Sequence, residues 1–199
     1  MEDGRKRKYS LKTIVNAIFY VTKTGVQWRN LPLDFPAWQL VYYYFRKWSK
    51  DGLISKIHQL LYEKVRIKEK REISPSLGLL DSQSVKTASL TTAKGLDANK
   101  KINGRKRFVV TDTVGWIIGL MVVAANVQKR EGAEKLFVLM NGKYPRLEKV
   151  LADQGFDGEE FTARIAKTFG FILEIVKKVL GVSGFQVLPK QWVVERTFG

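Results

Sequence analysis

The chain has 199 residues, of which 45% are hydrophobic and 12% aromatic, proportions typical of a globular protein with one or two domains. Its 35 lysines and arginines against 19 aspartates and glutamates give a formal net charge of +16, which favours a polyanionic partner, either nucleic acid or an anionic membrane surface. The lack of cysteine and the single histidine exclude disulfides and zinc sites built on Cys or His clusters. Any metal site must therefore use oxygen ligands, which favours Mg²⁺ or Mn²⁺.

Of the two candidate partners, the sequence favours nucleic acid over an anionic membrane surface. The longest uninterrupted apolar run, residues 116–125, has about half the length that a membrane-spanning helix needs. The charged N-terminus is not followed by an apolar signal region. We therefore expect a soluble, cytoplasmic nucleic-acid protein with no membrane partner.

The first 70 residues predict three short helices. In the first helix, apolar residues at helical spacing follow Ser10, the expected cap, and Gly25 ends the helix. The second helix is expected to carry Pro36 in its first turn and to stop near Gly52. One face of this second helix forms an aromatic stripe, which we assign to the core in preference to a base-stacking surface. The stripe consists of Trp38, Val41, Tyr42, Phe45 and Trp48.

The third helix begins near Ser55, and His58 lies beside its apolar face as a partly buried helix residue rather than a ligand. Its predicted buried positions are Ile57, Leu60, Leu61 and Val65. Three short helices with a basic exterior are compatible with helix-turn-helix packing. We therefore predict a small all-α, helix-turn-helix-like DNA-binding domain over residues 1–70, followed by a charged boundary that Pro75 breaks.

Residues 76–199 predict an α/β domain. Residues 77–80 form a short buried strand that ends at Asp81. A carboxylate at the end of a buried strand is costly unless a metal ion, a capped backbone or a cation is its partner. Further strands are expected at 108–112, 116–123, 149–153 and 171–176, and helices at 131–141, at 157–167 and from 191 onward.

A basic segment, residues 94–107, lies between the first two strands, and its glycines and asparagines predict a loop. A basic loop that follows a carboxylate strand is suited to hold phosphate, although each cation taken singly is equally compatible with plain surface charge. The candidate DNA-binding residues are Lys86, Lys100, Lys101, Arg105, Lys106, Arg107, Lys190 and Arg196.

Three carboxylates stand out by their positions. Asp81 ends the first strand, Asp153 ends the fourth, and Glu195 lies in the last helix. If the first and fourth strands are parallel neighbours, Asp81 and Asp153 emerge at the same edge of the sheet, where open α/β sheets place their sites. Three carboxylates from three elements can hold two divalent cations for phosphodiester transfer.

Three other acids have different explanations. Asp112, at the end of the predicted strand 108–112, is assigned to the hairpin turn that follows this strand. Asp157 is assigned to a helix cap. Glu174, within the fifth strand, is the substitute acid should Glu195 not serve.

Six motifs in collinear order carry a resemblance to a known family. They are Asp81-Ser-Gln-Ser-Val-Lys-Thr87, Gly104-Arg-Lys-Arg107, Asp112-Thr113, Ala125-Asn-Val-Gln128, Ala152-Asp-Gln-Gly-Phe-Asp157 and Trp192-Val-Val-Glu-Arg-Thr-Phe198. Together they resemble the DDE transposases of bacterial insertion sequences, most closely the group numbered five in the usual naming. The resemblance implies an α/β, ribonuclease-H-like catalytic domain with a mixed five-stranded sheet over residues 76–199, preceded by a helical domain that helps bind the ends of the element.

The same resemblance implies a catalytic and metal-binding triad of Asp81, Asp153 and Glu195, with two Mg²⁺ (or Mn²⁺) ions as cofactors. These ions would activate water to nick DNA at the element end, and then the freed 3′-hydroxyl to attack target DNA. The implied partner is DNA, both element ends and target, bound by a homodimer in the bacterial cytoplasm near the nucleoid. No small-molecule substrate is implied.

Two departures from the family pattern keep other functions open. Gln191, with Lys190 beside it, stands where the family often has an arginine. The family's last helix continues well past the glutamate, whereas this chain stops at Gly199, and the N-terminus is expected to be shortened as well. An alternative is therefore a catalytically inactive, truncated DNA-binding protein that represses transposition. A general RNA-binding protein would explain the basic charge equally well, but not the ordered acids.

Overall fold

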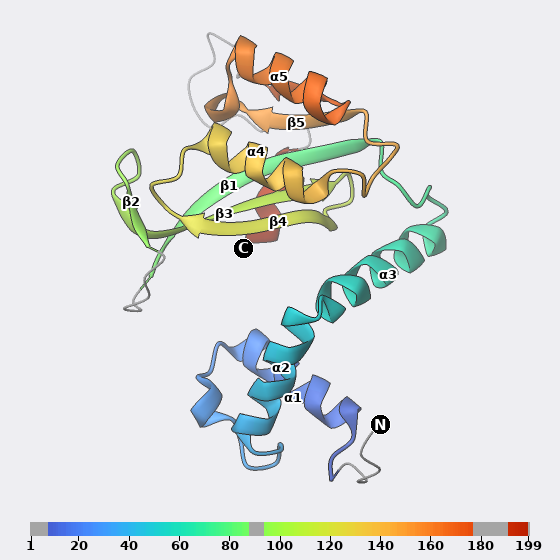
Figure 1. Ribbon diagram of the computed structural model, residues 1–199, viewed down its shortest axis with the longest axis vertical. Helices are drawn as coiled ribbons and strands as arrows, with labels where there is room; N and C mark the ends of the chain where they lie inside the picture. The colour runs from blue at the N-terminus through green and yellow to red at the C-terminus, as the bar shows by residue number, and fades with distance from the viewer. Residues whose placement is uncertain (1–7, 88–93, 177–190, 199) are drawn as a thin grey trace. The chain divides into compact units, whose positions relative to one another are not determined.

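The computed structural model describes residues 8–87, 94–176 and 191–198 (Figure 1). The chain divides into two compact units, Met1–Glu69 and Lys70–Gly199. The first unit contains the three expected helices, α1 (Leu11–Thr24), α2 (Trp38–Lys50) and α3 (Leu53–Lys68), and a short 3₁₀ helix, η1 (Trp28–Asn30).

Helix α1 has the predicted ends. The Ser10 hydroxyl accepts a hydrogen bond from the amide of Thr13 at 3.1 Å, which caps the N-terminus. Gly25 follows the helix with φ of 69°, and its amide donates to the Val21 carbonyl. Glycine adopts this left-handed conformation without the steric cost of a Cβ atom, so α1 ends there.

The core of the helical unit joins α1 to α2. Its buried residues are Ile14, Ala17, Ile18, Val21, Leu31 and Val41. Trp38, Phe45 and Trp48 of the aromatic stripe pack against this cluster, and the ring of Tyr42 lies 5.3 Å from that of Trp28. The prediction that the stripe belongs to the core is confirmed.

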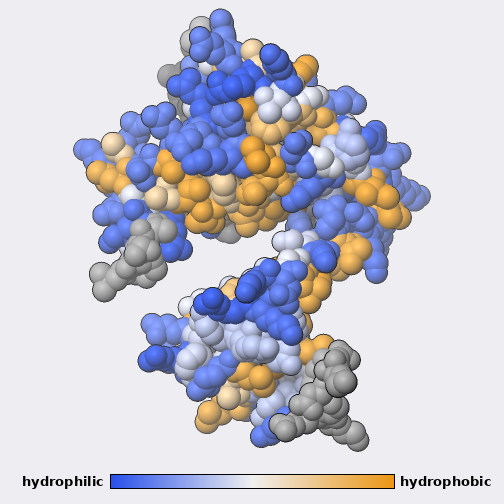
Figure 2. Space-filling view, in the orientation of Figure 1, coloured by the Kyte–Doolittle hydropathy of each residue, from blue (hydrophilic) through white to orange (hydrophobic). Residues whose placement is uncertain are grey.

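Three predictions for α2 and α3 are wrong, and one of them is the partly buried His58, which is exposed. Ala37 provides the first carbonyl that accepts helical hydrogen bonds, from the amides of Leu40 and Val41, so Pro36 precedes α2 instead of lying in its first turn. The predicted buried positions of α3 are between 37% and 58% exposed, and Figure 2 shows hydrophobic surface along this helix. Helical periodicity identifies an apolar face, but it does not say which element covers it.

The second unit is built on one mixed sheet. Its strands are β1 (Leu77–Lys86), β2 (Gly95–Asp97), β3 (Ile102–Asp112), β4 (Ile117–Ala124), β5 (Lys149–Asp153) and β6 (Ile172–Val176). Strand β1 pairs antiparallel with β3 and parallel with β5, while β4 lies antiparallel to β3 and β6 parallel to β5. These five strands have the ribonuclease-H-like order, which confirms the predicted fold class, and β2 adds a short sixth strand to β3.

Helices cover both faces of this sheet. The unit contains α4 (Lys129–Met140), α5 (Glu159–Phe169) and α6 (Gln191–Glu195), with two 3₁₀ helices, η2 (Gln154–Phe156) and η3 (Arg196–Phe198). Successive residues of a strand point to opposite faces. Phe108 of β3 packs against Gly132 of α4, whereas the next residue, Val109, packs with Val193 and Val194 of α6. Helix α4 therefore covers one face and α6 the other.

The basic segment 94–107 is not the predicted loop. Residues 95–97 form β2, and β3 begins at Ile102 and carries Arg105, Lys106 and Arg107. These cations are strand residues because β1 runs past the hydrophobic core to Lys86 and pairs with them. Asp81 accordingly lies within β1 and not at its end.

The two acids with predicted structural roles differ in outcome. The buried Asp112 accepts hydrogen bonds at its Oδ1 from the amides of Val114, Gly115 and Trp116, at 2.9 to 3.1 Å, so its role in the hairpin turn is confirmed. Gly158, not Asp157, is the N-cap of α5. Asp157 accepts from the amide of Gly158 and stands one position before the cap.

Candidate active site

The register of β1 and β5 brings Asp81 and Asp153 together. The two strands are parallel neighbours, and their last paired residues before the carboxylates are Leu80 and Ala152. Asp81 and Asp153 are the next residues on each strand. Beyond this point β5 turns into η2, while β1 continues beside β3. The predicted parallel arrangement is confirmed, and it places both acids where the two strands separate.

Glu195 joins them from α6. Val193 and Val194 are buried against β1 and β3, in a cluster with Leu79 and Val109, while Glu195 itself stays exposed. The three carboxylates line one open cleft of about 310 Å³. The other lining residues of this cleft are Ser82, Gln83, Lys100, Lys129 and Phe198.

The surroundings of Asp81 in the cleft shift its pKa. Burial, together with the negative charges of Asp153 and Glu195, raises the pKa of Asp81 from its ordinary 3.8 to about 6. The amide of Ser82, which donates to Asp81 Oδ1 at 2.6 Å, and the ammonium of Lys129 act in the opposite direction. A carboxylate in this situation gains from a nearby cation.

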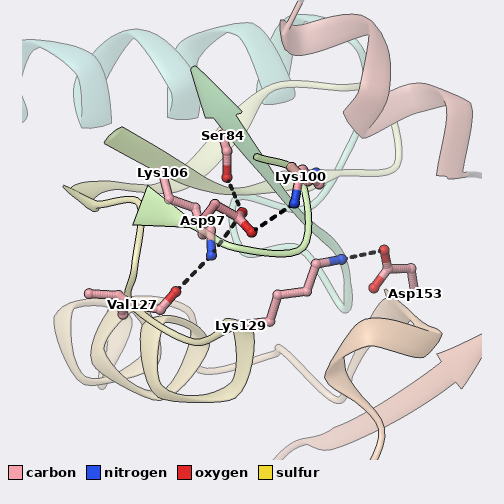
Figure 3. A network of polar contacts seen from close by, with 7 residues as sticks. All are labelled: Ser84, Asp97, Lys100, Lys106, Val127, Lys129 and Asp153. Atoms are coloured by element: carbon pink, nitrogen blue, oxygen red, sulfur yellow. Dashed lines mark hydrogen bonds and ion pairs between the residues drawn. The ribbon is translucent and has the colours of Figure 1, made fainter. Parts of the chain in front are cut away.

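Lys129 is a cleft residue that sequence reasoning missed. Its Nζ lies 2.6 Å from Asp153 Oδ2 (Figure 3). The same Nζ lies 4.9 Å from the centre of the Phe156 ring. One signal was present in the sequence: a lysine directly after the Ala125-Asn-Val-Gln128 motif, two residues before the predicted helix, and the structure places it in the first turn of α4. A cation is unfavourable at a helix N-terminus, so a lysine there needs a local anionic partner.

The predicted DNA-binding residues lie in different surroundings. Lys100 lines the cleft from the turn between β2 and β3, and Lys86 and Lys101 are exposed. The Arg107 guanidinium donates to Gln83 and lies 5.3 Å from the Phe198 ring, while exposed Arg196 donates to the Val114 carbonyl at 2.9 Å. Arg105 is half-buried on β3. Lys190 lies outside the described residues.

Lys106 differs from the expectation of a phosphate contact. Its side chain is 8% exposed, its Nζ lies 3.3 Å from Asp97 Oδ2, and it donates to the Val127 carbonyl at 2.7 Å (Figure 3). Asp97 also accepts from the Ser84 hydroxyl at 2.6 Å and the Lys100 amide at 3.3 Å. The Ser84 hydroxyl above all, and then the Lys100 amide and Lys106, lower the pKa of Asp97. Lys106 thus serves a buried ion pair.

Glu174 does not take the place of Glu195 as the third carboxylate of the cleft. It lies in β6, and its carboxylate forms an ion pair with Lys149 at 2.6 Å. It does not line the carboxylate cleft.

The donor atoms of the cleft suit a hard divalent cation. No three acidic or histidine side chains within residues 8–87, 94–176 and 191–198 form a ready-made metal site. Asp81, Asp153 and Glu195 nevertheless offer carboxylate oxygens to one cleft, which is the ligand type that Mg²⁺ and Mn²⁺ prefer. The buried Ser82 hydroxyl, which has no hydrogen-bond partner in the described part of the chain, lines the same cleft. The residues present therefore fit such an ion chemically.

Comparisons with solved structures find remote similarity to Mos1 transposase complexes. The chain in "Crystal structure of the Mos1 Strand Transfer Complex" is 14% identical, with a TM-score of 0.30, over 87% of this chain and 60% of that chain. The chain in "Mos1 transposase paired-end complex with left transposon end" is 12% identical, with a TM-score of 0.32 and the same coverage. This chain thus spans 60% of the length of either Mos1 chain.

Other comparisons address the sequence itself. No curated protein matches it. In the described parts of the chain, no helix has the length and apolar character needed to cross a membrane. The family model "Putative transposase of IS4/5 family (DUF4096)" matches residues 1–58, and the model "Transposase DDE domain" matches residues 72–199. Because the second match covers more than half of the chain and the first precedes it in order, this protein belongs to the DDE transposases of the IS4/5 type.

Proposed function

We propose that this protein cuts DNA at the ends of an insertion sequence and joins the freed strands to target DNA. The observation that carries this proposal is the adjacency of Asp81 and Asp153 on parallel strands, with Glu195 in the same cleft. When bound by these carboxylates, two divalent cations would supply Lewis acidity for the attacking and leaving oxygens of phosphodiester transfer. The proposal uses no covalent protein–DNA intermediate and no nucleophilic side chain.

The residues around the triad have separate parts in this proposal. The sheet holds the backbone of Asp81 and Asp153 side by side, whereas Glu195 is held through the buried Val193 and Val194. Lys100 lies at the cleft and is suited to contact a phosphate of the cleaved strand. Lys86, Lys101, Arg105, Arg107 and Arg196 are proposed to hold the DNA backbone farther out.

The helical unit is proposed to bind the element ends. It contains three short helices, and α2 presents exposed Tyr43, Arg46 and Lys47 away from the core. Such side chains suit phosphate contact and base stacking. Two DNA ends must be processed together, so we further propose that a homodimer carries out the reaction.

The test of the enzymatic function is Asp81→Asn in the full chain. The substrate is duplex DNA carrying the inverted repeats that flank the gene, and Mg²⁺-dependent cleavage is measured on a sequencing gel. We expect cleavage to fall at least roughly 100-fold, because one ligand of the reaction centre is lost. DNA affinity, measured by fluorescence anisotropy, should stay within about twofold of wild type, because the substitution removes no cation.

Glu174→Gln is the matched control. It neutralises an acid of the same sheet whose carboxylate pairs with Lys149 outside the cleft, so cleavage should be unchanged. Equal cleavage by wild type and Asp81→Asn would refute the assignment of the site. Wild-type DNA binding without any cleavage would instead support a repressor.

A further inference from the structure

The Lys129 ammonium is built into the carboxylate cleft. Its Nζ is 2.6 Å from Asp153 Oδ2, and the side chains of the two residues are 24% and 29% exposed. The face of the Phe156 ring lies 4.9 Å away, a cation–π distance. The ammonium therefore contacts both a carboxylate and an aromatic ring, in a partly buried position. Figure 3 shows its contact with Asp153.

The segment that leads into Lys129 is anchored to the sheet. Val127, two residues earlier, accepts a hydrogen bond from Lys106, which pairs with Asp97. Asp97 in turn binds Ser84 of β1. Three strands and the start of α4 are thus tied together by buried polar contacts, which fixes the point from which the Lys129 side chain extends.

The Lys129 side chain occupies space next to Gly155 that a Cβ atom would fill. A Cβ atom at this position would lie 2.6 Å from Lys129 Nζ and 2.7 Å from its Cδ. Real Cβ atoms do not approach other atoms so closely, so a side chain at residue 155 would push Lys129 away from Asp153. The absence of a side chain there is a second, independent feature that accommodates the ion pair.

We propose that Lys129 is the resident counter-cation of Asp153, and that a divalent metal ion must displace it from Oδ2 in order to bind. This inference rests on the proposed metal-dependent function. An ammonium and a metal ion compete for this carboxylate, because Oδ2 accepts a hydrogen bond from Lys129 and Oδ1 already accepts one from the amide of Gly155. Lys129 thus neutralises the acids of the metal-free cleft and weakens metal binding there.

The test compares Mn²⁺ affinity of full-length wild type and Lys129→Met, measured by isothermal titration calorimetry at one pH and one ionic strength. Methionine keeps an unbranched apolar side chain but cannot compete for the carboxylate. We expect the variant to bind Mn²⁺ roughly tenfold more tightly, in line with the strength of a partly exposed ion pair. Lys135→Met is the matched control, because Lys135 lies on the same helix and pairs with surface Glu131. Its Mn²⁺ affinity should equal that of wild type.

A second measurement does not depend on the folding of Lys129→Met. In wild-type protein labelled with ¹³C-lysine, the Cε resonance of Lys129 should shift on addition of Mg²⁺, and Asp153→Asn should abolish that shift. An unshifted Lys129 resonance at saturating Mg²⁺, or equal or weaker Mn²⁺ binding by folded Lys129→Met, would overturn the inference.

The experiment also separates this inference from the proposed function. If Mn²⁺ binding is lost in Asp81→Asn but is not tightened by Lys129→Met, the metal site stands and only the displacement of lysine is wrong. If wild type and Asp81→Asn bind Mn²⁺ equally, the metal site itself is wrong, and the inference fails with it.

Discussion

Leu80 and Ala152 are partners in the parallel pairing of β1 and β5, and the residue that follows each of them is an aspartate. This single register relation sets Asp81 beside Asp153. A slip of one residue in either strand would turn one of the carboxylates to the opposite face of the sheet. The hydrophobic residues before them, buried Leu79, Leu80 and Val150, oppose such a slip.

The stability of the metal-free protein should depend on the ionisation of Asp81. Its pKa is about 6 in the folded protein against an ordinary 3.8, so the folded state binds this proton more tightly than the unfolded state. The free energy of unfolding should therefore fall as pH rises from about 4 to about 6, and this contribution is flat above that range. Asn at position 81 cannot ionise. Above pH 6 the free energy of unfolding of Asp81→Asn should therefore exceed that of wild type by up to ~3 kcal/mol.

The measurement is urea denaturation in EDTA at several pH values between 4 and 7. The difference between Asp81→Asn and wild type should shrink as pH falls toward 4. Glu174→Gln, a surface acid outside the cleft, provides the control. A difference that is the same at all pH values would show that Asp81 is not destabilised by its surroundings.

Asp97→Asn should strongly destabilise the sheet unit. The substitution leaves the Lys106 ammonium buried, since both side chains of the pair are 8% exposed. Removing one partner of a buried ion pair costs about 3 kcal/mol or more. Glu134→Gln removes the carboxylate of an exposed pair with Arg164 and should cost less than about 1 kcal/mol. Thermal unfolding followed by circular dichroism distinguishes the two, and equal effects would argue against a structural role for the Asp97 network.

Gly155→Ala should be more destabilising while Lys129 is present. In wild type the new Cβ meets the far end of the flexible lysine side chain, which can move aside. The substitution should therefore cost no more than about 1 kcal/mol, the strength of the partly exposed ion pair that is lost. In a Lys129→Ala background the same substitution should cost less, since the lysine atoms are gone and only Asp153 Oδ1, 3.0 Å from the new Cβ, remains close. A double-mutant cycle by urea denaturation measures the coupling. Additive effects of the two substitutions would mean that residue 155 does not constrain the lysine.

Lys100→Gln should weaken DNA binding and reduce its dependence on salt. Lys100 lines the cleft, and one lost phosphate contact lowers the slope of log affinity against log salt concentration by about 1. Fluorescence anisotropy titrations between low and physiological salt measure this slope. Lys135→Gln removes the same charge from a surface ion pair on α4 and should leave the slope nearly unchanged. Similar slopes for all three proteins would place the DNA elsewhere.

Local signals in the sequence determined most of the element types. The Ser10 cap, Gly25 and the apolar spacing between them define α1, and the Asp112 side chain stabilises the turn of the predicted hairpin. Alternation and apolar runs located the five main strands. These features depend on neighbours only a few residues away, and such interactions can be read directly along the chain.

Other features depended on residues distant in the sequence. The cations of β3 belong to a strand only because β1 extends beyond the core to pair with them, and local composition indicated a loop instead. Similarly, the apolar face of α3 was visible, but its exposure was not. From the sequence alone, Lys106 is interpreted as surface charge. The tertiary structure places Asp97 and the Val127 carbonyl beside its ammonium group.

The sequence by itself determined the fold class, and it predicted the three carboxylates Asp81, Asp153 and Glu195 as a site of hard oxygen ligands. Only the tertiary structure decided that Lys129 holds Asp153 and that Gly155 leaves room for it. The physical reason is that a carboxylate's nearest cation is selected by strand register and helix placement. Among 35 lysines and arginines, no local pattern can identify that partner.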